Sequence, residues 1–187
     1  MVIDLPEQLI ALAELHIRNT DSNEANVRRA VSSAYYALFH LLVRDAVANW
    51  KHSDHRSRLA RTFDHKRMKD ASTAIVKKIG YVRNSESAES GPEQALRLRL
   101  STVAQAFVDL QQARHKADYD VEEPFQRLDA AVDVAQARLA FLTWAEVKDE
   151  PLASTHSGIW GNSRTGRPSR IVWPSPGCGA FSGAQGE

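Results

Sequence analysis

The chain has one cysteine, no long apolar run and almost no net charge, and each of these absences excludes a class of protein. Cys178 on its own cannot supply a disulfide framework or a cysteine-rich zinc site. No stretch of about 18 apolar residues is present to span a bilayer. Residues 1–5 also lack the basic start and apolar stretch of a secretory signal. We therefore expect a cytoplasmic protein with no membrane anchor.

Positive charge is concentrated in one short segment. The formal net charge of +1 gives no overall field that would attract nucleic acid or an anionic membrane. Between residues 51 and 69, however, two acids are outnumbered by seven bases: Lys51, Arg56, Arg58, Arg61, Lys66, Arg67 and Lys69. Such a run is either a solvated helix face or a phosphate-binding patch. The spacing of His52, His55 and His65 in it matches no ligand pattern, so neither a metal nor another cofactor is expected.

Five segments carry apolar residues at three- and four-residue spacing, which is the pattern of amphipathic helices around a shared core. They cover about residues 4–19, 21–50, 55–79, 90–119 and 120–149. The pattern predicts an all-α fold, an up-and-down antiparallel bundle of four to five helices spanning residues 1–149. We expect the first helix to lie across the bundle and the second to be central. A short connection makes the fourth and fifth antiparallel neighbours.

The helix ends and one helix face can also be predicted. Three capping boxes are expected, formed by Asp21 with Glu24, Ser90 with Glu93, and Asp120 with Glu123. Gly80 is placed to end the third helix in a left-handed conformation. The inward face of the fifth helix is predicted to be Phe125, Leu128, Val132, Ala135, Leu139 and Leu142.

Residues 150–187 differ in composition from the rest of the chain. Seven of the nine glycines and four of the seven prolines lie there, among serines and threonines, and no periodic apolar face remains. Such a segment buries too little apolar surface to offset the entropy of ordering it. We predict a disordered Gly/Pro/Ser-rich tail.

Two groups of polar residues could carry chemistry. On the second helix, Ser33, Tyr36 and His40 share one face, which could line a polar cleft or form a buried hydrogen-bonded network. At the end of the fourth helix, residues four apart are surface neighbours, as in the pairs Gln111 with His115, Arg114 with Asp118, and His115 with Tyr119. An arginine can hold a phosphate while a histidine moves a proton, although cations also commonly finish a helix.

Three segments together resemble a known superfamily. AVSSAYYALFHLL (30–42), RTFDHKRMK (61–69) and LQQARHKADYD (110–120) occur in the order found in HEPN (higher eukaryotes and prokaryotes nucleotide-binding) domains, over about residues 26–142. The resemblance implies a helical bundle, a homodimer, and an antitoxin or nucleotidyltransferase partner in a toxin–antitoxin or defence system. It also implies metal-independent ribonuclease activity in many members.

The chain departs from the catalytic motif of that superfamily. Members place a histidine four to six residues after the catalytic arginine, whereas here His115 follows Arg114 directly, about 100° around the helix. Binding of RNA, a nucleotide or a partner protein is therefore the first expectation. The alternative is an endoribonuclease using Arg114 and His115, assisted by Asp118 and Tyr119, with phosphate contacts from Arg61, His65, Tyr36, His40 and Lys116. A third possibility is an inert module in which Arg114, Asp118 and Tyr119 only lock the bundle.

Overall fold

A computed structural model describes residues 4–19, 21, 23–48, 55, 58, 60–83, 91–120, 122 and 124–150. Within these residues no strand is present. Five α-helices of 14 residues or more form the fold: α1 (Leu5–Arg18), α2 (Glu24–Ala48), α4 (His65–Arg83), α5 (Pro92–Tyr119) and α6 (Arg127–Val147). The predicted all-α class is confirmed. Of the predicted tail, residues 150–187, all but Glu150 lie outside the described residues.

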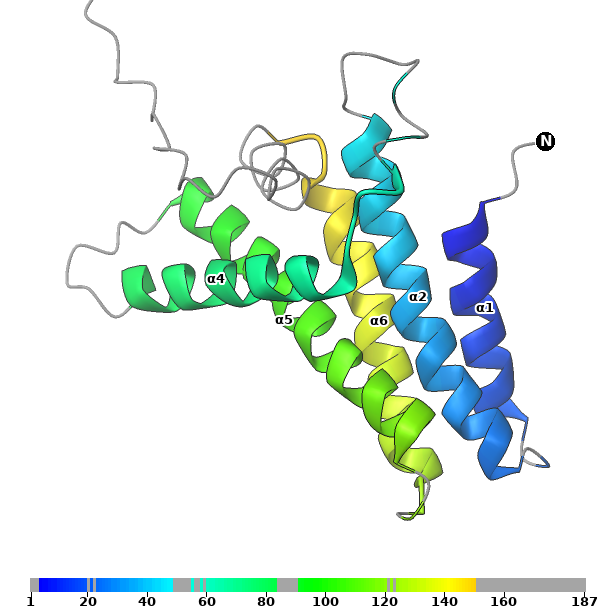
Figure 1. Ribbon diagram of the computed structural model, residues 1–187. Coiled ribbons are helices and arrows are strands. Elements are labelled where there is room, and N and C mark those ends of the chain that lie inside the picture. The colour runs from blue at the N-terminus through cyan, green and yellow to red at the C-terminus, as the bar shows by residue number, and fades with distance from the viewer. Residues whose placement is uncertain are drawn as a thin grey trace, which may run out of the picture.

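Four of the helices run up and down, and the fifth crosses them (Figure 1). α1, α2, α5 and α6 alternate in direction, which confirms the antiparallel bundle, and α4 packs across α5. The expectation that the first helix lies across the bundle is wrong. Its buried residues Pro6, Ile10 and Ala13 form a stripe along one side, so α1 packs lengthwise against α2 and α6.

α2 is the central helix, as predicted. Fourteen of its 25 residues are buried, because it contacts α1, α5 and α6 on different sides. Its alanines Ala30, Ala34 and Ala37 allow the neighbouring helices to approach closely, and Tyr35 and Leu38 fill the space between them. No helix in the described part of the chain combines the length and hydropathy needed to cross a bilayer.

The start of α2 does not use the predicted capping box. The Oδ1 of Asn23, not that of Asp21, accepts a hydrogen bond from a backbone N–H of the first turn, that of Asn26, at 3.0 Å. The Glu24 carboxylate accepts from the side chain of Arg28 and from the backbone N–H of Phe125 at 3.2 Å. Glu24 therefore ties the connection before α6 to α2, which a pattern based on one helix cannot reveal.

The other predicted helix ends also differ. α5 begins at Pro92 after Gly91, with no side-chain cap, and Ser90 lies outside the described residues. α6 begins only after Gln126, so Asp120 does not cap it; Glu123 also lies outside the described residues. Gly80 lies inside α4, which continues to Arg83. α4 itself begins at residue 65, ten residues later than predicted.

The predicted inward face of α6 is wrong. Leu128, Val132, Ala135, Leu139 and Leu142 are exposed, and Phe125 is half-buried. The buried face consists instead of Ala130, Val134, Ala137, Ala140, Phe141, Trp144 and Val147. Both faces repeat every three or four residues, so spacing alone fits either one. The two aromatic side chains decide the outcome: Trp144 is fully buried, and its Nε1 donates a hydrogen bond to Asp45 Oδ2 of α2 at 2.9 Å.

Candidate functional site

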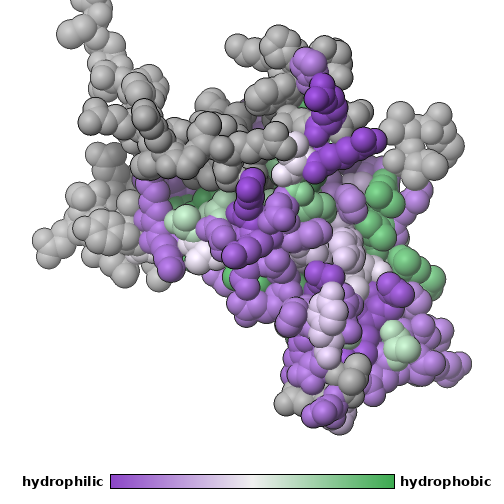
Figure 2. Space-filling view, viewed as in Figure 1, coloured by the Kyte–Doolittle hydropathy of each residue, from purple (hydrophilic) through white to green (hydrophobic). Residues whose placement is uncertain are grey.

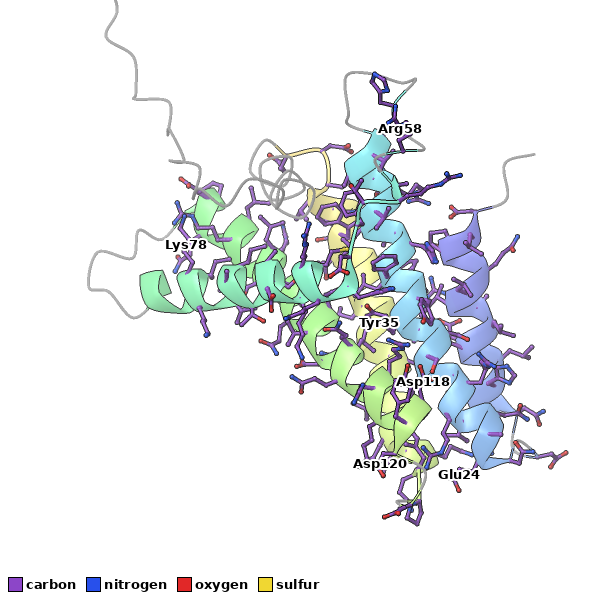
Figure 3. All side chains as sticks on the ribbon, viewed as in Figure 1. Glu24, Tyr35, Arg58, Lys78, Asp118 and Asp120 are labelled. Carbon is purple, nitrogen blue, oxygen red and sulfur yellow. The ribbon has the colours of Figure 1, made fainter. Side chains whose placement is uncertain are left out.

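The end of α5, the middle of α2 and the start of α4 meet around the side chain of Arg114. Figure 3 shows the labelled Tyr35 and Asp118 on the facing helices α2 and α5. We call this group the Arg114 cluster, and it comprises Tyr35, Tyr36, His65, Arg114, Asp118 and Tyr119. All of these except Tyr35 were predicted site residues, and they come from three segments that are far apart in the sequence.

Arg114 is held by one ion pair and by aromatic rings. Its Nε donates to Asp118 Oδ2 at 2.7 Å, one helical turn further on, as the four-residue spacing predicts. The guanidinium carbon lies 5.3 Å from the ring centre of Tyr36, 5.7 Å from that of Tyr35 and 5.9 Å from that of Tyr119. These distances are in the range of cation–π attraction, so the guanidinium has a defined position.

The Asp118 carboxylate connects α5 to α2. One oxygen accepts from Arg114, and the other accepts a hydrogen bond from the hydroxyl of the buried Ser32. The predicted polar face of α2 contained Ser33 rather than Ser32. Ser32 and Asp118 are 86 positions apart, so only the packing of the two helices could reveal this bond.

His65 joins the cluster from the first position of α4. Its Nδ1 lies 2.6 Å from the hydroxyl of Tyr35, and its ring lies 5.9 Å from the Tyr36 ring and 4.1 Å from the Phe39 ring. Burial and then the positive charge of Arg114 lower the pKa of His65, while burial raises that of Tyr35 far above its usual value. His65 is therefore neutral at pH 7, and its Nδ1 shares one hydrogen bond with the protonated Tyr35 hydroxyl, in which the tautomer of the ring decides which group donates.

The remaining predicted residues lie at the edge of the cluster or outside it. His115 is exposed and reaches the cluster through Tyr119, with ring centres 5.0 Å apart. His40 stacks against Tyr36 at 6.4 Å, and burial lowers its pKa. Arg61 and Lys116 are exposed. The structure thus separates Arg114 from His115 and brings it near His65.

Tyr35 was missed because its ring belongs to the core. Helical spacing assigns it to a different face from Tyr36, and its ring is fully buried against Phe107. A tyrosine at a core position nevertheless needs a hydrogen-bond partner for its hydroxyl, and that requirement was the available signal. Gln111 was missed as a support: its Nε2 donates to the backbone carbonyl of His65 at 3.2 Å.

Arg28 fixes the end of α5 on which the cluster rests. Its Nη1 donates to the backbone carbonyls of Lys116, Ala117 and Asp120, at 3.4, 3.1 and 2.7 Å. Carbonyls in the last turn of a helix have no partner within the helix, so a side chain from α2 supplies one. The guanidinium also lies 5.2 Å from the ring centre of Phe125. The end of α5 is thereby held against α2.

Comparison with known proteins adds no further constraint. No protein-family model, no curated protein and no solved structure matches the chain. HEPN membership therefore stays a prediction based on the three sequence segments. Within the part of the chain that the structure describes, no three histidine, cysteine, aspartate or glutamate side chains lie close enough together to hold a metal ion; His52 lies outside it.

Proposed function

We propose that this helical domain binds a phosphate-bearing ligand, either RNA or a nucleotide, at the Arg114 cluster. The observation that carries the proposal is the way Arg114 is held. Its Nε donates to Asp118, and its guanidinium lies over the rings of Tyr36 and Tyr119. The two terminal nitrogens make no hydrogen bond to a described residue. Those nitrogens carry four N–H donors in a fork that matches two phosphate oxygens.

The surroundings of Arg114 suit a nucleotide. Tyr119 is 65% exposed, and the exposed His115 ring lies beside it at a tilt of 48°, so both rings offer surfaces on which a base can stack. Lys66 and Arg67, on the first turn of α4, add positive charge at a helix N-terminus, where anions are favoured. Figure 2 shows mainly hydrophilic side chains where α4 crosses the bundle.

The resemblance to HEPN domains supports the same ligand class. It extends the proposal to a cytoplasmic homodimer that works with an antitoxin or nucleotidyltransferase in a toxin–antitoxin or defence system. These finer statements depend on the resemblance. The binding proposal depends on the contacts of Arg114.

A metal-independent endoribonuclease is the second candidate, and the neutral His65 favours it. In the tautomer in which the Nδ1–H of His65 donates to the Tyr35 hydroxyl, Nε2 carries the lone pair that can accept a proton from an RNA 2′-hydroxyl. The 2′-oxygen then attacks the adjacent phosphorus and displaces the 5′-oxygen. Arg114 would stabilise the extra negative charge on the phosphorane, and His115, when protonated, would donate a proton to the leaving oxygen. The products are a 2′,3′-cyclic phosphate and a 5′-hydroxyl. His65 here acts as the base and His115 as the acid, whereas the sequence pointed to His115 alone for proton transfer.

The test is RNA binding by variants of the full chain, measured by fluorescence anisotropy with a labelled single-stranded RNA. We expect Arg114→Ala to weaken binding by about 10-fold or more, since a charged bidentate contact is lost. Arg114→Lys keeps the charge but not the fork, so it should restore only part of the affinity. Arg99→Ala is the control, because Arg99 is also on α5 but pairs with Glu146.

Three outcomes separate the candidates. Equal weakening by Arg114→Ala and Arg99→Ala would mean non-specific charge attraction and would contradict the binding site. Cleavage of the RNA without metal, lost in both Arg114→Ala and His65→Ala, would establish the nuclease. If the protein binds neither RNA nor a nucleotide and Arg114→Ala lowers the melting temperature strongly, only the inert module is left. In that module the hydrogen bonds that Arg114 and Ser32 donate to Asp118 serve only to join α5 to α2.

A further inference from the structure

The outer side of α6 carries a continuous row of large apolar side chains. Leu128 is 76% exposed, Val132 60%, Leu139 54% and Leu142 58%, and Ala135 is exposed between them. We call these five residues the α6 stripe. They follow one another at intervals of four, three, four and three residues, so they stay in line over about 21 Å of helix. This is the repeat with which one helix packs lengthwise against another.

α6 is apolar on two sides, because its buried side holds Phe141 and Trp144 as well as alanines and its outer side holds the stripe. Three alanines, Ala130, Ala137 and Ala140, are fully buried, while three leucines face outward. Apolar side chains exposed singly are ordinary, but a contiguous row of them marks an interaction surface. α1 and α5 contact the two sides of α6 and leave the stripe uncovered by described residues.

The proposed function includes a homodimer, and on that basis we propose that its two copies associate by antiparallel packing of their α6 stripes. The stripe is complementary to itself in this orientation. When the two-fold axis passes between residues 133 and 134, Leu128 lies opposite Leu139 of the second copy, and Val132 lies opposite Ala135. A larger and a smaller side chain then meet at the centre, where two helices approach most closely, and leucines meet on either side.

The charges beside the stripe favour the antiparallel orientation. Asp129 then faces Gln136 of the second copy along one edge, and Arg138 faces Ala131 along the other, so no like charges meet. In a parallel pair, the next four-residue step of the stripe leads from Leu142 to Glu146. The Glu146 carboxylates of the two copies would then lie against each other. In the antiparallel pair those carboxylates lie about 35–40 Å apart, from the rise of 1.5 Å per residue.

The stripe and the Arg114 cluster lie on different parts of the molecule. The buried side of α6 packs against α2 and α5, and the stripe lies on the opposite side of the same helix. Figure 1 shows α6 behind α2, so a second copy on the outer side of α6 would leave the cluster uncovered. The association therefore does not depend on the proposed binding of phosphate ligands.

The first test is the mass of the full chain in solution, measured by sedimentation equilibrium between about 1 and 200 μM, because a short helix–helix interface gives a modest affinity. We expect twice the chain mass of 20.8 kDa in the wild type. Leu139→Glu and Leu128→Glu should each weaken the dimer by 10-fold or more, with unchanged helical circular dichroism because both side chains are exposed. Leu15→Glu, on α1 and 61% exposed, is the control and should leave the dimer intact.

The second test determines the orientation, using cysteine variants in a Cys178→Ser background. A mixture of Val132→Cys and Ala135→Cys chains should form a disulfide between copies on mild oxidation. Leu142→Cys alone should form none, because its two copies lie about 25 Å apart along the antiparallel pair. A monomer at every concentration, a dimer that Leu139→Glu leaves unchanged, or a covalent Leu142→Cys dimer would each overturn the proposal.

Discussion

At the scale of single residues, the ring of Tyr35 belongs to the core and its hydroxyl belongs to the Arg114 cluster. Arg114 is likewise only partly used within the protein: its Nε donates to Asp118, while its terminal nitrogens make no hydrogen bond to a described residue. The pair Arg114 with Asp118 follows from helical spacing alone and is confirmed. The bond between Tyr35 and His65 spans 30 positions and depends on the crossing of α4.

We expect His65 to make the protein less stable in mild acid, against the opposite contribution of Asp133, whose pKa burial raises to about 6. Its pKa in the folded state is below the ordinary value of 6.5, so the unfolded chain binds the proton more tightly. The contribution of His65 is thus fully present above pH 6.5 and is lost as the pH falls below that value toward the lower folded pKa. His40 acts in the same direction. Urea unfolding between pH 5 and 7.5 measures the slope.

His65→Gln should reduce this slope, since it removes the group whose protonation the folded state disfavours. His115→Gln, which removes an exposed histidine next to the same cluster, is the control. An identical slope in the wild type and in His65→Gln would show that the acid sensitivity has another source.

At the scale of helices, ends and faces are decided by neighbouring elements. Asn23 rather than Asp21 caps α2, and Arg28 of α2 supplies the hydrogen bonds that the end of α5 lacks. The short-range rules name residues that are able to cap a helix. Which of them does so depends on where the chain runs before and after the helix.

Arg28→Ala should destabilise the protein by about 2–3 kcal/mol, because several partly buried carbonyls at the end of α5 lose a charged donor. The free energy of unfolding in urea measures the effect. Arg29→Ala is the control: Arg29 is the next residue on α2 and is exposed, so its loss should change stability by less than about 0.5 kcal/mol. Equal effects of the two substitutions would contradict the role of Arg28 at the α5 end.

At the scale of the whole molecule, the crossing of α4 over α5 brings a histidine to a cluster otherwise built from two antiparallel helices. Because the net charge is only +1, any nucleic acid must be held by local contacts.

We therefore expect a weak dependence of RNA affinity on salt. Two or three phosphate contacts give a slope of log K against log salt of about −1.5 to −2, since each contact on a single strand contributes about −0.7. Arg114→Ala should make the slope smaller in magnitude by about 0.7, as one phosphate contact is lost. Anisotropy titrations from about 50 to 300 mM salt measure it. An unchanged slope in that variant would mean that Arg114 does not contact a phosphate.

The sequence alone determined the helical class, the central position of α2 and the neighbours within one helix, such as Arg114 and Asp118. These follow from local spacing, because residues three or four apart on a helix always share a face. Only the tertiary structure decided that α4 and not α1 crosses the bundle, that His65 meets Tyr35, and that α6 buries Trp144 while its leucines face outward. In each case the local spacing of residues fitted more than one arrangement. The packing of side chains from distant parts of the chain selected the arrangement that forms.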